Sequence, residues 1–215
     1  MKRILKLLTL LATLLSLQAC ALSGGPINGQ VLEEETGKPI PDAIVVATWH
    51  GNDSSGLVHS QSVCYHVETA RTDANGKFHI NAWSDGISMR SLLINERYVI
   101  TDAYKPGYTR SVKPVNELIK NILLARFKGT AKERLEYLER MLGSTRCGSQ
   151  NESEKNLHMF FSAMYEEAKN IAVTKEDLEI ADALRYWASF VILDKSKPTT
   201  RDAKGRLINV DQNGN

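Results

Sequence analysis

The spacing of the apolar residues changes once along the chain, near residue 128, and this change limits the folds available to it. From residue 27 to 127, short apolar segments alternate with turns rich in glycine, proline and asparagine, as in β-strands. From residue 130 to 194, apolar residues recur every three or four positions, as on amphipathic helices. Strands followed by helices predict an α+β chain, with a β domain over 27–128 and a helical region over 129–194.

The β domain is expected to be a seven-stranded antiparallel β-sandwich, because short strands with regularly spaced turns are typical of that architecture. The segments predicted as strands are 27–32, 43–49, 65–72, 77–82, 97–104, 108–113 and 122–127. The segment 43–49 is apolar at odd and even positions alike, so we expect it to be covered on both faces. Asn75 and Gly76 predict a tight turn that joins 65–72 and 77–82 as a hairpin.

The helical region is expected to contain about three amphipathic helices, each beginning at a pair of residues that can cap it. These pairs, three positions apart, are Thr130 with Glu133, Asn151 with Glu154, and Thr174 with Asp177. Amphipathic helices need a surface to cover, and the sequence leaves open whether they pack on one another or on the sandwich. Residues 195–215 contain few apolar residues and are predicted to form a flexible tail.

The first 20 residues resemble the signal of an exported bacterial lipoprotein. A basic segment, Lys2 to Lys6, precedes an apolar run that ends at Leu15 and is shorter than the roughly 20 residues that span a bilayer. The following Leu-Gln-Ala-Cys, which ends at Cys20, resembles a lipobox. The resemblance implies cleavage before Cys20 and its acylation, and several acyl chains together anchor a protein stably. The alternative is an ordinary signal peptide with an incidental cysteine.

This resemblance implies a signal peptide over 1–19, a lipidated tether over 20–26 and attachment to the membrane through palmitate and other acyl chains. The residue after the cysteine is Ala21. An aspartate at this position would imply the inner membrane, so the alanine implies the Gram-negative outer membrane, with the folded body facing the periplasm. Removal of the signal lowers the basic side chains from 27 to 24, against 25 acidic ones. The mature chain therefore lacks the net basicity of a nucleic-acid-binding protein, and no nucleic acid partner is expected.

Four motifs in the β domain resemble the carboxypeptidase regulatory-like domain. They are Asn-Gly-Gln-Val at 28–31, Thr-Gly-Lys-Pro-Ile-Pro-Asp-Ala at 36–43, Thr-Asp-Ala-Asn-Gly-Lys-Phe at 72–78 and Ala-Tyr-Lys-Pro-Gly-Tyr at 103–108. The resemblance covers about half of the mature chain and implies a transthyretin-like, or prealbumin-like, sandwich. Members of that family are usually non-catalytic accessory domains. The helical region does not match the family's usual pattern.

Cys64 and Cys147 are predicted to form a disulfide. An exported compartment is oxidising, so a cysteine pair there favours a disulfide over two free thiols. Strand alternation places an apolar set on the core face, namely Val67, Thr69, Phe78, Ile80 and Ala82, and places Cys64, His66, Glu68, His79, Asn81 and Trp83 on the other face. A helical layer could cover that second face, and Cys147 lies between the first two predicted helices.

A metal site is a weaker alternative for the histidines. The candidates are His59, His66 and His79, and zinc needs three or four ligands that converge on one point. His66 and His79 are expected to lie about four residues apart along one face, too far to converge without a loop. No cofactor is predicted.

The sequence favours a non-catalytic accessory or interaction module, with an envelope protein or a glycan as its partner. One alternative is an envelope hydrolase or metal-dependent enzyme that uses His66 or His59, although no nucleophile elbow is present. Another is a carbohydrate-binding module, with a platform made from Trp49, Trp83, Tyr104 and Tyr108.

Overall fold

The computed structural model describes residues 21–55, 61–111, 121–144, 147, 152–188, 199–201 and 207–209. The predicted signal peptide, Cys20 and His59 lie outside the described residues. The protein is an α+β structure, as predicted, and its described helices are α2 (Met89–Leu93), α3 (Ala131–Ser144), α4 (Glu152–Ile171) and α5 (Lys175–Ala188). None of these helices is both long enough and apolar enough to cross a membrane.

Two sheets contain the seven strands that the sequence predicts. The larger has the order β5 (Lys77–Ile80), β2 (Ile27–Glu33), β9 (Asn121–Arg126), β8 (Tyr108–Arg110). The smaller has the order β4 (Gln61–Arg71), β3 (Ile44–Asp53), β7 (Ile94–Tyr104). β2 and β9 run parallel, so the prediction of an all-antiparallel arrangement is wrong at this pair. A parallel pair needs a long connection, and most of the β domain lies between these two strands.

The two sheets face each other across one apolar core. The larger sheet contributes Ile27, Val31, Phe78, Ile80, Ile122 and Leu124, and the smaller contributes Val45, Ala47, Trp49, Ile94 and Ala103. Because successive side chains of a strand point to opposite faces, the alternate residues of β3, Ile44 and Val46, point away from this core.

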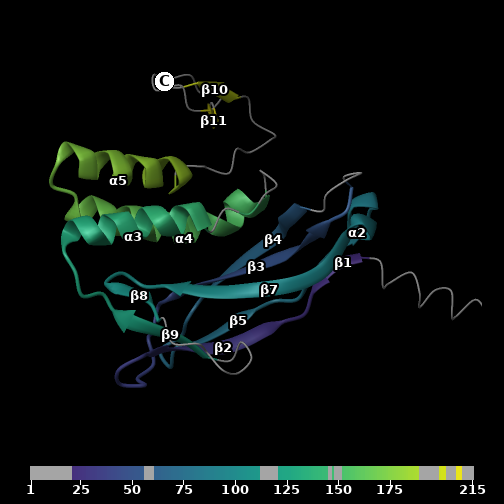
Figure 1. Ribbon diagram of the computed structural model, residues 1–215, viewed down its shortest axis with the longest axis horizontal. Coiled ribbons are helices and arrows are strands. Elements are labelled where there is room, and N and C mark those ends of the chain that lie inside the picture. Colours follow the sequence, from purple (N-terminus) through teal and green to yellow (C-terminus); the bar gives the residue numbers. More distant parts are fainter. Residues whose placement is uncertain are drawn as a thin grey trace, which may run out of the picture.

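Helices α3, α4 and α5 form a third layer over that opposite face of the smaller sheet (Figure 1). A second apolar cluster joins Ile44, Val46, Val67 and Tyr104 of the strands to helix residues that include Leu138, Leu142, Leu157, Phe160 and Met164. β3 is therefore buried on both faces, which confirms the expectation for segment 43–49. The helices pack on one another and on the sheet, so the two arrangements left open by the sequence occur together.

Two of the predicted helix caps are confirmed. The hydroxyl of Thr130 accepts a hydrogen bond from the amide of Glu133, and the Glu133 carboxylate accepts one from the amide of Thr130. Thr174 and Asp177 make the same reciprocal pair at the start of α5. Each pair satisfies backbone donors that the first turn of a helix leaves free. Asn151 lies outside the described residues.

β4 and β5 lie in different sheets, so the predicted hairpin between them is wrong. The predicted turn is nevertheless present, because the Asp73 carboxylate accepts hydrogen bonds from the amides of Asn75 and Lys77, at 2.9 and 2.8 Å. Gly76 has a φ of 70°, and a Cβ there would lie 2.6 Å from the carbonyl oxygen of Val31. The turn thus carries the chain from one sheet to the other, where β5 pairs with β2.

Short strands also lie in the segments predicted to be a lipidated tether and a flexible tail. In the predicted tether, 20–26, β1 (Ala21–Gly24) pairs antiparallel with β6 (Trp83–Ile87). Leu22 is buried in the core between the sheets, and Gly24 lies so close to the Trp83 indole that a Cβ would clash with it. In the predicted tail, 195–215, β10 (Thr199–Arg201) pairs antiparallel with β11 (Leu207–Asn209). Burial of Leu22 and pairing with β6 therefore hold residues 21–24 on the domain.

A buried ion pair between Arg134 of α3 and Glu167 of α4 joins the helices to the sheets. Arg134 Nε and Nη2 donate to the two carboxylate oxygens of Glu167, at 3.0 and 2.8 Å. Arg134 also donates to the carbonyl of Tyr108, while Glu167 accepts from the Tyr104 hydroxyl and the Gly107 amide. Burial, and next the Glu167 carboxylate, raise the pKa of Tyr104. Two helices and the β7–β8 turn therefore meet at one hydrogen-bonded network.

Loss of one partner would leave the other charge buried and unpaired. We expect Glu167→Gln to lower the free energy of unfolding by about 3–5 kcal/mol, measured by denaturant titration. Glu166→Gln is the matched control, because Glu166 is 61% exposed and makes a long ion pair with Lys169, at 3.9 Å. Its effect should stay within about 0.5 kcal/mol. Equal effects of the two variants would contradict this role for the ion pair.

Candidate functional site

A β-bulge at Tyr65 sets the direction in which the first residues of β4 face. Trp49 of β3 lies opposite His66, whereas the next residue of β3, His50, lies opposite Cys64. Tyr65 is therefore an extra residue in β4, and it packs into the core between the sheets. Cys64, just before the bulge, points toward the helical layer.

The faces predicted for the side chains of β4 are wrong at several residues. Val67 and Thr69 were expected in the core between the sheets, but Val67 packs among the helices and the Thr69 hydroxyl donates to the carbonyl of Asn156 in α4, at 2.7 Å. These two residues were assigned to the wrong face because the helices bury the second face of the sheet as well. His66 was expected on the same face as Cys64 and lies on the opposite one, against Trp49, because the inserted residue interrupts the alternation.

Cys64 and Cys147 form a disulfide, as predicted, with their Cα atoms 4.9 Å apart and a separation of 83 residues in sequence. Cys147 lies between α3 and α4, so the bond ties that connection to β4. The prediction succeeded although the alternation behind it was wrong, because the bulge returns Cys64 to the face that the helices cover.

His66 is enclosed by aromatic rings. Its ring stacks on Trp83 with the centroids 3.5 Å apart, and it meets Trp49 edge-on at 5.3 Å. Nε2 of His66 lies 3.0 Å from Oε1 of Glu68, and the side chain is only 10% exposed. Trp83 Nε1 is buried and has no hydrogen-bond partner among the described residues. This cluster is packed rather than open, so it leaves little room for a ligand at His66.

The structure does not bring the candidate metal ligands together. His79 is on β5, in the other sheet from His66, and its two ring nitrogens lie 2.6 and 3.1 Å from side-chain oxygens of Asn28 and Asn81. His59 lies outside the described residues. Among the described residues, no three His, Cys, Asp or Glu side chains lie close enough to hold a metal ion.

The four aromatic residues considered as a sugar platform do not share a surface. Trp49 and Tyr104 are buried, and they belong to different apolar clusters on opposite faces of the smaller sheet. Trp83 stacks on His66, while Tyr108 lies on β8 beneath Arg126. Aromatic residues that are buried on separate faces cannot present one stacking plane to a sugar.

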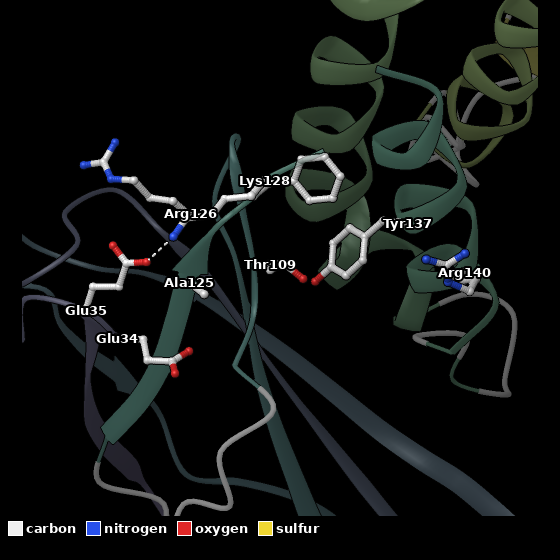
Figure 2. A pocket seen from close by; sticks show the side chains of 9 residues that line it. Glu34, Glu35, Thr109, Ala125, Arg126, Lys128, Tyr137 and Arg140 are labelled. Atoms are coloured by element: carbon white, nitrogen blue, oxygen red, sulfur yellow. Dashed lines mark hydrogen bonds and ion pairs between the residues drawn. The ribbon is translucent and has the colours of Figure 1, made fainter. Parts of the chain in front are cut away.

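An open groove of about 470 Å³ lies between the β8–β9 edge and helix α3. Figure 2 shows the Tyr137 hydroxyl directed from α3 toward Thr109 of β8. That hydroxyl accepts a hydrogen bond from the amide of Arg110, at 3.0 Å. Together with the bond from Arg134 to the carbonyl of Tyr108, it satisfies backbone groups at the outer edge of β8.

The charges around this groove are largely paired with one another. Lys128 binds Glu35, at 2.5 Å, across the groove wall, and Arg126 binds Glu33, at 2.6 Å. Glu33 is buried, and a hydrogen bond from Thr36 together with Arg126 lowers its pKa. A ligand would have to displace these pairs, so we regard the groove as a structural seam between α3 and the sheet.

A second, more enclosed cleft of about 190 Å³ lies between the smaller sheet and helices α3 and α4. Its apolar walls are Val46, Ile100, Met141 and Phe160, and its polar residues are Thr48, His50, Asp102 and Arg110. Burial lowers the pKa of His50, and burial raises the pKa of Asp102 although Arg110, 3.5 Å away, opposes that shift. An apolar cleft with a few polar groups is the common form of a binding site.

The cleft continues into an exposed apolar strip on β7, which consists of Tyr98 and Ile100. Tyr98 is 48% exposed and Ile100 is 40% exposed, although both point to the face that the helices cover elsewhere. The ring of Tyr98 stacks on His50 at 5.4 Å. Sequence analysis missed this surface. The sequence feature that could have revealed it is the apolar run from Tyr98 to Ile100, which leaves β7 without a purely polar face.

Neither a search of protein-family models nor a search of curated proteins found a match to this chain.

The disulfide should contribute substantially to stability, because it closes a long loop. We expect the double variant Cys64→Ala, Cys147→Ala to lose about 4–5 kcal/mol of unfolding free energy, measured by denaturant titration without reductant. Addition of reductant should destabilise the wild type and leave the double variant unchanged. A wild type that is insensitive to reductant would contradict this contribution.

Proposed function

We propose that the chain is a lipid-anchored envelope protein whose folded body is a non-catalytic module that binds an extended segment of a partner polypeptide. The N-terminal signal, with Cys20 at its end, supports acylation and placement on the outer membrane facing the periplasm. The disulfide agrees with an oxidising compartment. The single observation that carries the binding role is the β7 strip with its adjoining cleft.

The fold proposed for the β domain is a prealbumin-like sandwich. Two sheets around one core support it, as do the turns at Gly37, Gly76 and Gly107, which fall in the motifs that resemble the carboxypeptidase regulatory-like domain. In that family such domains usually act as accessories, which agrees with a binding role for this body.

The edge of β7 suits an extended peptide. β3 is its one hydrogen-bonded neighbour among the described strands. In an antiparallel pair, every second residue directs its amide and carbonyl away from the partner. Ala103 belongs to this outward set, because its amide donates to the Asp102 carboxylate, and the alternation adds Val99 and Thr101. A partner strand could therefore pair along β7 while its side chains reach the strip and the cleft.

Peptides selected from a random phage-displayed library against the folded protein should slow hydrogen exchange at Val99 and Thr101. Ile100→Asp should weaken their binding by about tenfold or more, because it places a charge in the apolar strip. Leu178→Asp on α5 is the control, since Leu178 is 51% exposed and far along the chain from the cleft. Failure to select peptides, or protection confined to other strands, would overturn the proposal.

Acylation is tested separately by metabolic labelling with palmitate. The wild type should be labelled, and Cys20→Ala should lose the label because the acceptor sulfur and the new N-terminus are lost together. The double variant Cys64→Ala, Cys147→Ala should keep the label and serves as the control for cysteine removal. A label that persists in Cys20→Ala would refute the anchoring.

A further inference from the structure

We infer that strand β1 and helix α2 form a membrane-facing surface, which holds the body against the bilayer in one orientation. The inference rests on the proposed acylation of Cys20. The partner of this surface is the lipid bilayer, with Leu92 of α2 inserted among the headgroups and upper acyl chains. The argument depends on the short distance between the anchor and the fold, on a clamp at that point, and on the exposed side chain of Leu92.

The anchor and the fold have no spacer between them. β1 begins at Ala21, the residue bonded to Cys20, and Ala21 pairs with Ile87 of β6. Consecutive Cα atoms are about 3.8 Å apart, so the acylated residue is held beside the first residue of a paired strand. Leu22, the second residue of β1, is buried in the core between the sheets. Acyl chains on Cys20 would therefore draw this end of the body to the bilayer.

Arg97 fixes the anchor point to α2. Its Nη1 donates to the carbonyl of Ala21 at 3.1 Å, and its Nη2 donates to the carbonyl of Ser91 in α2. Its Nε donates to the carbonyl of Ile94, directly after the helix, at 3.0 Å. One guanidinium thus binds the start of β1 and the end of α2 together, so the helix cannot lie far from the anchor.

Helix α2 carries the apolar contact. Leu92 is 53% exposed, the largest exposed fraction among the large apolar side chains of the β domain that the structure describes. Ser88 and Ser91 cap the helix reciprocally, which fixes its direction. Between residues 83 and 97 the sequence has two acidic and two basic residues, Asp85, Glu96, Arg90 and Arg97. Because this stretch of sequence has no net charge, we expect neutral and anionic lipid to bind alike, through Leu92 rather than by electrostatic attraction.

The geometry favours lipid over a protein partner at this surface. A protein would have to enter between α2 and the bilayer to which the neighbouring residue is attached. The β7 strip lies farther along the strand that follows α2, so contact of α2 with lipid leaves the strip and the cleft free. Figure 1 shows α2 and β1 together at one end of the sheets, whereas α5 lies in the helical layer.

The test places one environment-sensitive fluorophore on an introduced cysteine. Leu92→Cys and Leu178→Cys are matched, because the two leucines are 53% and 51% exposed and belong to different helices, α2 and α5. With Cys20 acylated and Cys64 bonded to Cys147, the introduced thiol is the one available for labelling. Full-length mature protein is placed in vesicles of phosphatidylethanolamine and phosphatidylglycerol. Nitroxide-labelled lipid should quench the probe at position 92 several-fold more than at 178, and aqueous iodide should do the reverse.

Intact mass of the same samples separates the two proposals. An acylated protein with equal quenching at both positions overturns the membrane-facing surface and leaves the anchoring intact. An unacylated mature protein overturns the anchoring and this inference with it. A flexible Gly-Ser spacer inserted between Cys20 and Ala21 should keep the acyl mass and reduce lipid quenching at position 92. Unchanged quenching in that variant would refute the role of the direct linkage.

Discussion

The bidentate ion pair between Arg134 and Glu167 sets the position of the helical layer, and the surfaces of interest depend on that position. Its two side chains come from different helices, and both bind backbone groups of the β7–β8 region. Such a pair is costly to bury, so its stabilising value depends on every oxygen and N–H having a partner. Here the partners come from three segments, and the network therefore specifies one docking angle. The cleft lies between the smaller sheet and the same two helices, with Met141 of α3 and Phe160 of α4 in its wall.

Most of the elements could be predicted from the sequence, because hydrophobic period and capping chemistry are local signals. β3 is apolar on both faces since it lies between two apolar clusters, and Thr130 and Thr174 cap helices through neighbours three residues away. The parallel pairing of β2 with β9 and the crossing from β4 to β5 were not predictable in this way. They depend on which distant strand is adjacent, and the turn at Gly76 has the same sequence in either case.

The residues of functional interest also divide into those that the sequence can identify and those that only the structure identifies. His66 and Trp83 attract attention in the sequence as chemically rich side chains, but they are stacked in a closed cluster. The surface that stands out in the structure contains Tyr98 and Ile100, which in the sequence resemble ordinary strand residues. Their distinction is exposure, which depends on where the helices end. Both hollows contain an ion pair, Glu35 with Lys128 in the groove and Asp102 with Arg110 in the cleft, but burial raises the pKa of Asp102.

The disulfide between Cys64 and Cys147 makes the final packing of the layers depend on the compartment in which the protein folds. It is the covalent tie between the sheets and the connection of α3 to α4. Where thiols are kept reduced, this tie is missing, and the helices are held on the sheets by packing and hydrogen bonds, including the Arg134 network. Under the export proposed for this chain, a newly made protein would remain looser and easier to unfold until it reached an oxidising compartment. On that proposal, the cross-link would delay the rigid state until after transport.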